Sequence, residues 1–356
     1  MPTKKSVNLK AVDFFCGAGG MSLGLSNAGI NVLGGIDNAS DCKRTYESNI
    51  PRARFIEHDI STLSPAELGR QLSLNVDDPS LIFAGCSPCQ FWSKIRTDKT
   101  KAARTAFLLG HFQKFIRHFR PGFVVIENVP GLRNQRQKSI LPAFITFLKR
   151  EKYAWDDGII NANHYGVPQN RRRYLLIATR LTSSISLPLA TPDPLLTVSA
   201  FIGIANGFRK IQAGYRDLSG FQHSACALSP NNLRRIQRTR KSGGDRLVWK
   251  DDESLQINAY RDRDHIFRDV YARMYWERPA PTITTRFTSF SNGRFGHPEE
   301  DRAISIREGA TLQTFPAKFV FHGPSMTSVA RQIGNAVPPE LARRIGEHLV
   351  RIAANG

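Results

Sequence analysis

Two thiols stand where an enzyme could use one as a nucleophile. Gly85-Cys-Ser-Pro-Cys-Gln90 brings Cys86 and Cys89 directly after the apolar run Leu81–Ala84. A loop at the carboxyl end of a buried parallel strand is where α/β enzymes place their reacting groups. A cysteine there can attack a substrate as its thiolate and form a covalent intermediate. We therefore predict a reacting thiol in this loop.

Other interpretations of the Cys-x-x-Cys spacing are a metal site, a redox pair and a buried structural cysteine. A zinc site needs a second ligand pair, which Cys16, Cys42 and Cys226 do not supply at zinc spacing. A redox pair lacks a thioredoxin-like context. A structural cysteine leaves the neighbouring Pro-Cys-Gln and the basic loop after it unexplained. We predict no metal site, and the odd number of cysteines favours a reducing compartment.

A carboxylate and two arginines follow other strand-like segments. Glu127 ends the run Phe123–Ile126, so it would face the same edge of the sheet as the thiol loop and could share a proton with a ring nitrogen. In Gln169-Asn-Arg-Arg-Arg-Tyr174, alternation along a strand would put Arg171 and Arg173 on one side. The simpler alternatives are a helix-capping acid and a solvated basic face.

The segment 11–20, Ala-Val-Asp-Phe-Phe-Cys-Gly-Ala-Gly-Gly, reads as a strand that enters a glycine-rich turn before a helix. Glycines allow a close approach of the backbone to a ligand, and the helix N-terminus offers free N–H groups. The dinucleotide spacing G-x-G-x-x-G is not met, because Ser22 follows Gly17 and Gly19. Asp37 ends the second strand, where a carboxylate can accept ribose hydroxyls or simply close a turn.

The first half of the chain alternates apolar runs with helical patterns, which predicts a doubly wound α/β sheet. We expect a helix capped by Ser40 and running to about Ser48. The predicted strands are Ala11–Phe15, Val32–Ile36, Leu81–Ala84, Phe123–Ile126 and Leu175–Ala178. A further helix is predicted from one apolar face made by Leu108, Phe112, Phe115, Ile116 and Phe119.

The pattern changes after about Thr179. Residues 183–300 are rich in Pro, Gly, Ser and Asn and predict a smaller irregular domain of loops and short strands, with Thr282–Thr285 as one strand-like piece. Helical character returns in Ser305–Gln313 and Pro339–Ala354. The predicted division is 1–182 for a catalytic and cofactor-binding domain, 183–300 for a recognition domain, and 301–356 for a return to the first domain.

The net charge indicates a polyanionic partner. The 356 residues hold 50 Lys and Arg against 30 Asp and Glu, a formal charge of +20. Eight basic residues and one acid fall within 91–120, and seven and one within 231–250. No apolar run is long enough to span a bilayer and no secretory signal is present, so we expect an intracellular protein without a membrane partner.

Taken together, these segments resemble the cytosine-5 DNA methyltransferases of bacterial restriction-modification systems. The resemblance covers roughly residues 9–180 and 300–350 and rests on short blocks in the family's order. The blocks are Asp13-Phe-Phe-Cys-Gly-Ala-Gly-Gly20, Pro88-Cys-Gln90, Glu127-Asn-Val129, Gln169-x-Arg171-x-Arg173, Arg307-Glu-Gly-Ala310 with Gln313-Thr-Phe-Pro316, and Gly334-Asn-Ala-Val337. Residues 183–300 match the family's variable target-recognition region in position only.

The resemblance implies a Rossmann-like methyltransferase domain with a mixed, mostly parallel sheet that binds S-adenosyl-L-methionine. Phe15 would stack on the adenine and Asp37 would hold the ribose; Asn38 stands where many members have an aromatic residue. The implied cofactor contacts are Asp13, Phe15, Cys16, Gly17, Gly19, Gly20, Asp37, Asn38, Asp59, Ile60, Pro88, Asn335 and Ala336. The implied catalytic residues are Cys89, Glu127, Arg171 and Arg173.

The implied activity is methyl transfer to C5 of a flipped-out cytosine in double-stranded DNA, with Cys89 as the nucleophile at C6. The basic loop Phe91–Arg104 would close on DNA, and bases would be read within 183–300, with Arg234, Arg235, Arg238 and Arg240 as candidates. We expect a monomer in the bacterial cytoplasm, nucleoid-associated when bound to DNA, with a cognate restriction endonuclease acting separately. The alternatives are a tRNA cytosine-5 methyltransferase, an inactive DNA-binding relative and an NAD-dependent dehydrogenase.

Overall fold

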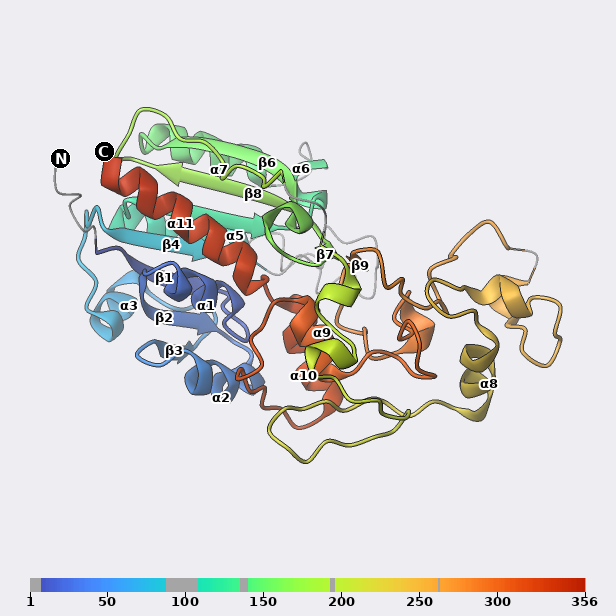
Figure 1. Cartoon of the computed structure of the whole chain (residues 1–356). Helices are drawn as coiled ribbons and strands as arrows, with labels where there is room; N and C mark the ends of the chain where they lie inside the picture. The colour runs from blue at the N-terminus through green and yellow to red at the C-terminus, as the bar shows by residue number, and fades with distance from the viewer. Residues whose placement is uncertain (1–7, 88–107, 135–139, 193–195, 262, 356) are drawn as a thin grey trace. The chain divides into compact units, whose positions relative to one another are not determined.

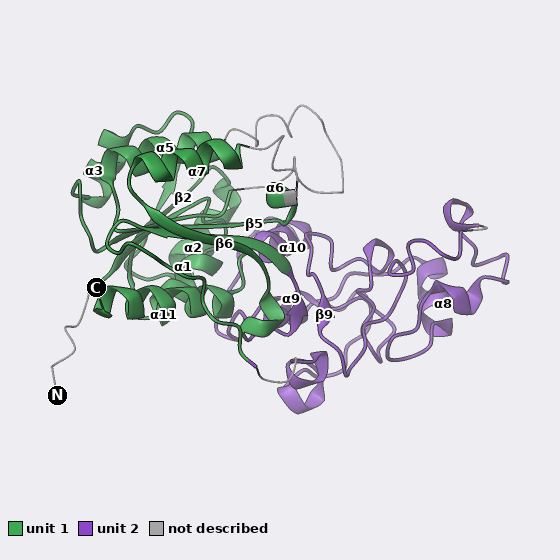
Figure 2. Cartoon of the chain, turned by 90° about the horizontal axis from the view of Figure 1, so that it is seen from above, with its two compact units in different colours: residues 1–165, 172–191, 336–356 green, residues 166–171, 192–335 purple. Residues whose placement is uncertain are grey.

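The computed structural model describes residues 8–87, 108–134, 140–192, 196–261 and 263–355. The chain divides into two compact units (Figure 2). Unit 1 comprises residues 1–165, 172–191 and 336–356, and unit 2 comprises 166–171 and 192–335. These bounds differ from the predicted ones, because residues 301–335 belong to unit 2 and a short piece, 166–171, joins them there. Among the described residues, no helix is long and apolar enough to cross a membrane.

Unit 1 is built on a seven-stranded sheet of order β3-β2-β1-β4-β5-β8-β6. The strands are β1 (Lys10–Phe14), β2 (Asn31–Asp37), β3 (Arg54–Glu57), β4 (Leu81–Gly85), β5 (Phe123–Asn128), β6 (Ala154–Asn161) and β8 (Arg172–Thr179). The pairs from β3 to β5 are parallel, and β8 is antiparallel to both β5 and β6. The mixed, mostly parallel sheet is confirmed, and each of the five predicted strands lies in it.

Helices cover both faces of this sheet (Figure 1). One face carries α1 (Gly20–Asn27), α2 (Ser40–Asn49) and α11 (Pro339–Asn355), and the other carries α3 (Pro65–Leu72), α5 (Leu108–Phe119) and α7 (Leu141–Arg150). A short helix, α6 (Gly131–Asn134), follows β5, and a 3-10 turn, η2 (Ala162–Tyr165), follows β6. The helix predicted at Ser40 forms, but its N-cap is Ala39, and no side chain caps it.

Aromatic packing joins the sheet to α5. The ring of Phe14 in β1 lies 4.8 Å from Phe112 and 5.1 Å from Phe115, and 5.0 Å from Phe83 in β4, measured between ring centroids. All four side chains are fully buried. Because burying one such side chain stabilises the fold by roughly 1.5–3 kcal/mol, this cluster holds β1, β4 and α5 together next to the glycine-rich turn. The predicted apolar face of α5 is confirmed, with Leu108 only partly buried.

Unit 2 contains little regular structure. Its elements are β7 (Gln169–Asn170), α8 (Pro230–Arg238), β9 (Ala280–Pro281), α9 (Ile306–Leu312) and α10 (Met326–Asn335), with short 3-10 turns between them. The strand-like piece predicted at 282–285 is wrong, since the strand there is Ala280–Pro281, paired in parallel with β7. The helix predicted from Ser305 is confirmed, and Ser305 and Glu308 form a reciprocal capping box at its start.

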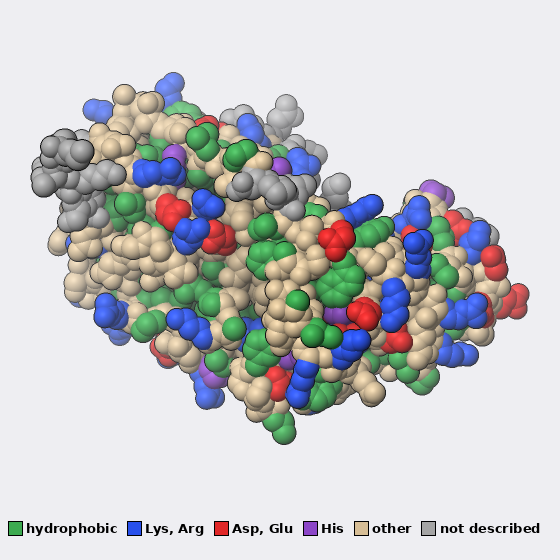
Figure 3. All heavy atoms as spheres, in the orientation of Figure 1, with side chains coloured by type: hydrophobic (Ala, Val, Ile, Leu, Met, Phe, Trp, Pro, Cys, Tyr) green, Lys and Arg blue, Asp and Glu red, His purple; other side chains and the backbone are tan. Residues whose placement is uncertain are grey.

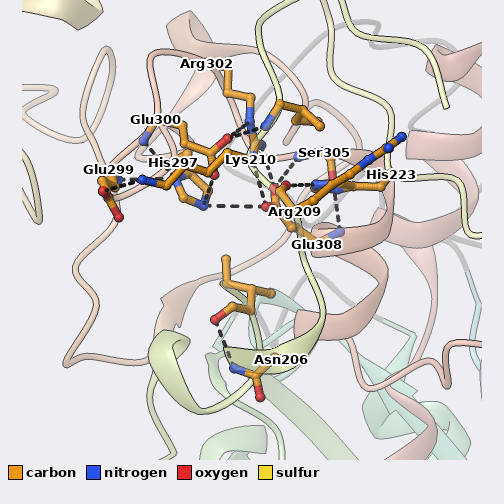
Figure 4. A network of polar contacts seen from close by, with 12 residues as sticks. Asn206, Arg209, Lys210, His223, His297, Glu299, Glu300, Arg302, Ser305 and Glu308 are labelled. Atoms are coloured by element: carbon orange, nitrogen blue, oxygen red, sulfur yellow. Dashed lines mark hydrogen bonds and ion pairs between the residues drawn. The ribbon is translucent and has the colours of Figure 1, made fainter. Parts of the chain in front are cut away.

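A buried charge network holds the middle of unit 2 together (Figure 4). Arg302 donates to both carboxylate oxygens of Glu308, at 2.7 and 2.8 Å, and also to Glu300 at 3.1 Å. The side chains of Arg302 and Glu308 are fully buried. Burial alone would raise the pKa of Glu308, but the charge and hydrogen bonds of Arg302 outweigh it and hold the pKa at about 2. The carboxylate is therefore ionised and paired inside the protein.

His297 completes this network as a neutral ring. Its Nδ1 accepts the backbone N–H groups of Glu299 and Glu300, so its proton sits on Nε2, 3.4 Å from Glu300 and 3.5 Å from Glu308. His297, Glu300 and Glu308 are close enough to hold a metal ion. An ion there would have to displace the Nε2 proton of His297 and compete with Arg302, which already donates three hydrogen bonds to the two carboxylates, so we interpret the cluster as a structural charge network.

We expect Glu308→Gln to lower the free energy of unfolding by roughly 3–5 kcal/mol at pH 7, because it leaves Arg302 buried without its carboxylate. The wild-type stabilisation is present above the ordinary glutamate pKa near 4.5 and is lost as the pH falls toward about 2. Burial also lowers the pKa of His297, so the unfolded state gains a proton first as the pH drops below 6.5.

Urea unfolding between pH 3 and 8 measures this difference. The exposed Glu253→Gln is the matched control and should change the free energy by less than about 0.5 kcal/mol. Equal stability of Glu308→Gln and wild type at pH 7 would show that the network does not stabilise unit 2.

Candidate active site

The glycine-rich turn after β1 is hydrogen-bonded to a carboxylate at the end of the next strand. Asp37, at the end of β2, accepts the N–H of Gly17 at 2.8 Å and the N–H of Ala39 at 2.9 Å. Phe15 and Gly17 take positive φ values of 63° and 49°. Burial raises the pKa of Asp37 above its ordinary value, against these backbone hydrogen bonds. Asp37 thus connects the end of β2 to the turn that follows β1.

The three glycines of this turn have different roles. A Cβ on Gly20 would lie 2.1 Å from the carbonyl oxygen of Val337, so α1 and the start of the last segment approach at backbone distance. A Cβ on Gly19 would meet the ring of Tyr46 at 3.0 Å. Around Gly17 no described atom lies within 4 Å of that position. Gly19 and Gly20 therefore serve packing, and Gly17 borders free space that a ligand can use.

Asp13 lies fully buried beneath this turn. Its Oδ2 accepts the backbone N–H of Ser22 at 3.1 Å and the hydroxyl of Ser22 at 2.7 Å, and that hydroxyl also bonds Tyr46 at 2.9 Å. Its Oδ1 has no hydrogen-bond partner among the described residues. Burial raises the pKa of Asp13 from 3.8 to about 7 despite the Ser22 bonds. An unpartnered carboxylate oxygen below an open turn fits a cationic ligand such as an amino group or a sulfonium.

The remaining predicted cofactor residues differ in their exposure and in the unit to which they belong. Cys16 and Ile60 are buried and Phe15 is partly exposed, while Asn38 and Asp59 are exposed at the ends of β2 and β3. Asp59 accepts the N–H of Ser61 at 2.8 Å, which lowers its pKa. Ala336 belongs to unit 1, where its Cβ lies 3.4 Å from the Cβ position of Gly20. Asn335 is exposed and belongs to unit 2, and Pro88 lies outside the described residues.

The predicted catalytic carboxylate and arginine meet at the same sheet edge. Nε of Arg173 lies 3.0 Å from Oε1 of Glu127, and their side chains are only 12% and 9% exposed. The antiparallel register explains the meeting, because β8 begins where β5 ends, with Tyr174 opposite Asn128. The contact is an ion pair without the alignment of a hydrogen bond, so Glu127 keeps capacity to bind a substrate group.

Asn128 is a functional candidate that the sequence analysis did not select. Its Nδ2 donates to the carbonyl and the hydroxyl of Ser87, at 3.3 and 3.1 Å, and its Oδ1 accepts the N–H of Val129. The end of β5 is thereby tied to the segment that leads into the thiol loop. The sequence signal that could have identified Asn128 is its position next to Glu127 in the Glu-Asn-Val block. Residues 85–87 of the thiol loop are described and Cys86 is partly exposed, whereas Cys89 lies outside the described residues.

Arg171 is placed differently from Arg173, although only one residue separates them. It is buried in unit 2 and donates to the carbonyls of Ile283 at 3.1 Å and Gly334 at 3.2 Å. Gln169 continues this arrangement, since it accepts the N–H of Ile283 and donates to Gln313 at 2.9 Å. Arg171 therefore positions the backbone of unit 2, and its catalytic role stays a prediction.

Comparisons with known proteins agree with this geometry. A family model described as C-5 cytosine-specific DNA methylase matches residues 9–351. The chain is 38% identical over 345 residues to the type II methylase M.HgiDII of Herpetosiphon aurantiacus, covering 96% of this chain and 94% of the relative. It is 30% identical to the type II methyltransferase M1.BsuMI of Bacillus subtilis, covering 98% and 82%.

A solved structure shares the fold. It is a putative DNA modification methyltransferase encoded within an Escherichia coli prophage, with a TM-score of 0.75, 23% sequence identity and coverage of 97% of this chain and 99% of that chain. The fold and the sheet edge define a Rossmann-like methyltransferase. The chain belongs to the C-5 cytosine-specific DNA methylase family, and it is a DNA cytosine-5 methyltransferase. Family membership implies the use of S-adenosyl-L-methionine, and Asp13, Gly17 and Asp37 fit it.

We expect Gly17→Ala and Gly20→Ala to fail in different ways. The first places a methyl group in the free space of the turn, at a positive φ, and should weaken S-adenosyl-L-methionine binding by about 10-fold or more while the protein stays folded. The second clashes with backbone and should lower the melting temperature. Calorimetric titration and thermal unfolding separate the effects. Unchanged cofactor affinity in a folded Gly17→Ala protein would move the ligand away from this turn.

We expect Glu127→Gln to reduce kcat for methyl transfer by about 100-fold or more, with a much smaller effect on DNA affinity, because the lost charge is needed as the ring is activated. Single-turnover methylation and equilibrium DNA binding give the two numbers. Asp157→Asn, which breaks the 3.4 Å ion pair with Arg133 elsewhere on the sheet, is the matched control and should leave kcat near wild type. A kcat that Glu127→Gln leaves intact would remove this residue from the mechanism.

Proposed function

We propose that this enzyme methylates C5 of one cytosine within a specific duplex DNA sequence, through a covalent bond between Cys89 and C6 of the ring. The observation that carries the proposal is the pairing of Glu127 and Arg173 at the carboxyl edge of β5. Glu127 supplies a carboxylate that can accept a hydrogen bond or share a proton, and Arg173 supplies a cation beside it. Together they can bind two sides of a planar heterocycle. Cytosine offers matching groups in N3 and its amino group on one side and O2 on the other.

The chemistry requires activation, because C5 of cytosine is a poor nucleophile. The Cys89 thiolate adds to C6, the π electrons of the C5–C6 bond shift into the C4–C5 bond, and those of the C4–N3 bond move onto N3, where the charge is shared with O2. The product is an enamine with an electron-rich C5. Glu127 shares a proton with N3 and holds the amino group, while Arg173 stabilises the charge on O2. S-adenosyl-L-methionine supplies an electrophilic methyl group for the electron-rich C5. Loss of the C5 proton to a base then expels the Cys89 thiolate and restores the aromatic ring.

The cofactor is held by the turn between β1 and α1. Asp37 would accept the ribose hydroxyls, and Phe15 and Ile60 would contact the adenine. The Oδ1 of Asp13, which has no hydrogen-bond partner among the described residues, would accept from the ammonium group of the cofactor's amino-acid end. The positive charge of this ammonium group would compensate the negative charge of the buried Asp13 carboxylate. Cofactor binding would therefore favour the ionised form of Asp13.

The duplex must release its target base, because stacking shields the ring face and C6. Base extrusion costs a few kcal/mol, which contacts with phosphates can offset. The basic segment 91–104 is our candidate for these contacts and lies outside the described residues. We further propose that the enzyme acts as a monomer in the bacterial cytoplasm, as one half of a restriction-modification pair with a separate endonuclease. The relatives named as type II enzymes support this role.

Covalent trapping tests the mechanism without knowledge of the target sequence. Duplex DNA copied with 5-fluorocytosine in place of every cytosine should form an adduct that survives denaturation, and only with S-adenosyl-L-methionine present. After methyl transfer, the fluorine on C5 cannot leave as a cation, so elimination stops and the bond to C6 persists. Denaturing electrophoresis detects the adduct, and peptide mapping should find it at Cys89.

Matched thiol variants supply the control. Cys89→Ala should form no adduct, and Cys86→Ala should still form one. Preferential trapping on 5-fluorocytidine-containing transfer RNA would favour an RNA substrate instead. Attachment to Cys86 or any other thiol would overturn the assignment of the nucleophile, and the absence of any adduct on DNA would overturn the covalent mechanism.

A further inference from the structure

Helix α8 (Pro230–Arg238) is fixed to unit 2 from beneath. Ile236 is fully buried and packs with Phe290 and Ala303. The helix begins with a side-chain cap, since Ser229 accepts the N–H of Asn232. Nine residues give a helix about 13 Å long. A helix of this length remains ordered on a surface only when tertiary contacts hold it.

The fully buried guanidinium of Arg273 holds the carboxyl end of α8. Arg273 donates to the carbonyl of Ile236 at 2.7 Å and to the carbonyl of Thr239 at 3.0 Å. It also donates to the carbonyls of His297 and Glu300 and to the carboxylate of Asp301, so all five of its N–H groups are used. A cation at a helix carboxyl terminus complements the helix dipole. The end of α8 is therefore bound to the charge network described above.

Arg235 turns inward and fixes the helix from its side. It donates to the carbonyls of Leu255 at 2.8 Å and Gln256 at 3.3 Å, and its guanidinium lies over the rings of Trp249 and Tyr271. These contacts occupy it within the protein. Of the four arginines predicted to contact DNA, Arg235 is therefore not available for that contact. Its role is to position α8.

The outer face of α8 carries a different set of side chains. Asn231, Arg234, Gln237 and Arg238 are all exposed and span about 120° of the helix circumference. Arg234 donates to the amide oxygen of Asn231 at 2.7 Å, one turn earlier, and Arg238 pairs with Asp252 at 3.2 Å. Gln237 has no hydrogen-bond partner among the described residues. Figure 3 shows that Lys and Arg side chains are frequent on the part of unit 2 that carries α8.

This combination of side chains can read base edges. Arg, Asn and Gln all contact phosphates, but they are also the side chains that bind a base through two hydrogen bonds, Asn and Gln with adenine and Arg with guanine. The outer face contains no acid and alternates guanidinium with carboxamide groups on a rigid helix. The major groove of DNA accepts an α-helix, and 13 Å of helix reaches about four base pairs.

We propose that α8 enters the major groove and reads base edges, with Arg234 contacting a guanine through O6 and N7, and Gln237 contacting an adjacent base. Asn231 orients Arg234 through their shared hydrogen bond. The inference rests on the proposed function and names the residues that determine its sequence specificity.

The test is a comparison of variants on a library of duplexes with randomised sequence. Methylated duplexes are identified by sequencing, and bound duplexes are selected in parallel, so that recognition is measured with and without catalysis. Arg234→Ala should relax discrimination at one base pair by about 10- to 100-fold and leave the other positions unchanged. Gln237→Ala should relax a neighbouring position. Thermal unfolding should be unaffected, because both side chains are exposed.

Arg240→Ala is the charge-matched control, since Arg240 is exposed but lies beyond the end of the helix. It should change the affinity for all sequences to the same extent. If Arg234→Ala also weakens all sequences uniformly and makes the salt dependence shallower, Arg234 is a phosphate contact and the proposal fails. Unchanged recognition would also overturn it. A wild-type enzyme that methylates no duplex refutes the proposed function separately, and the binding selection still tests α8.

Discussion

The active edge depends on the geometry of the sheet. Strands β1, β2, β4 and β5 run parallel, so their carboxyl ends converge at one edge, and β8 enters that edge from the opposite direction. The convergence brings the glycine-rich turn, Asp37 and Glu127 to the same side of unit 1. Since β8 is antiparallel, its first residues and not its last ones reach the site, which is how Arg173 meets Glu127.

Unit 2 is stabilised by buried arginines that bind backbone carbonyl groups. Its long irregular segments leave many backbone carbonyls without partners in helices or strands, and buried carbonyls need hydrogen bonds. Fully buried arginines supply them. Arg273 and Arg307 donate mainly to carbonyls of distant loops, and Arg302 neutralises the buried Glu308. A guanidinium has five donors in a fixed plane, which suits it to join several chain segments at one point.

The chain passes from unit 2 to unit 1 between Arg171 and Arg172. Neighbouring arginines of one block therefore serve two purposes: Arg171 fixes carbonyls of unit 2, and Arg173 pairs with the carboxylate of unit 1. The same division occurs on α8, where Arg235 holds the helix and Arg234 is left for a partner. On α8, successive side chains point about 100° apart around the helix axis, so Arg234 and Arg235 face different surroundings. Arg171 and Arg173 would share one side of a continuous strand, but Arg171 lies between β7 and β8, and this break in the strand separates them.

The sequence alone determined the parallel strands, the glycine-rich turn and the position of Glu127 at a strand end, because these depend on local hydrophobic runs and on residues next to them. It also carried the blocks that identify the family. It did not determine which arginines are buried. Arg171 bonds to carbonyls 112 and 163 residues away, and no local pattern separates such a residue from a surface arginine. Only the tertiary structure decides where a guanidinium finds its acceptors, since those acceptors lie on segments brought together by folding.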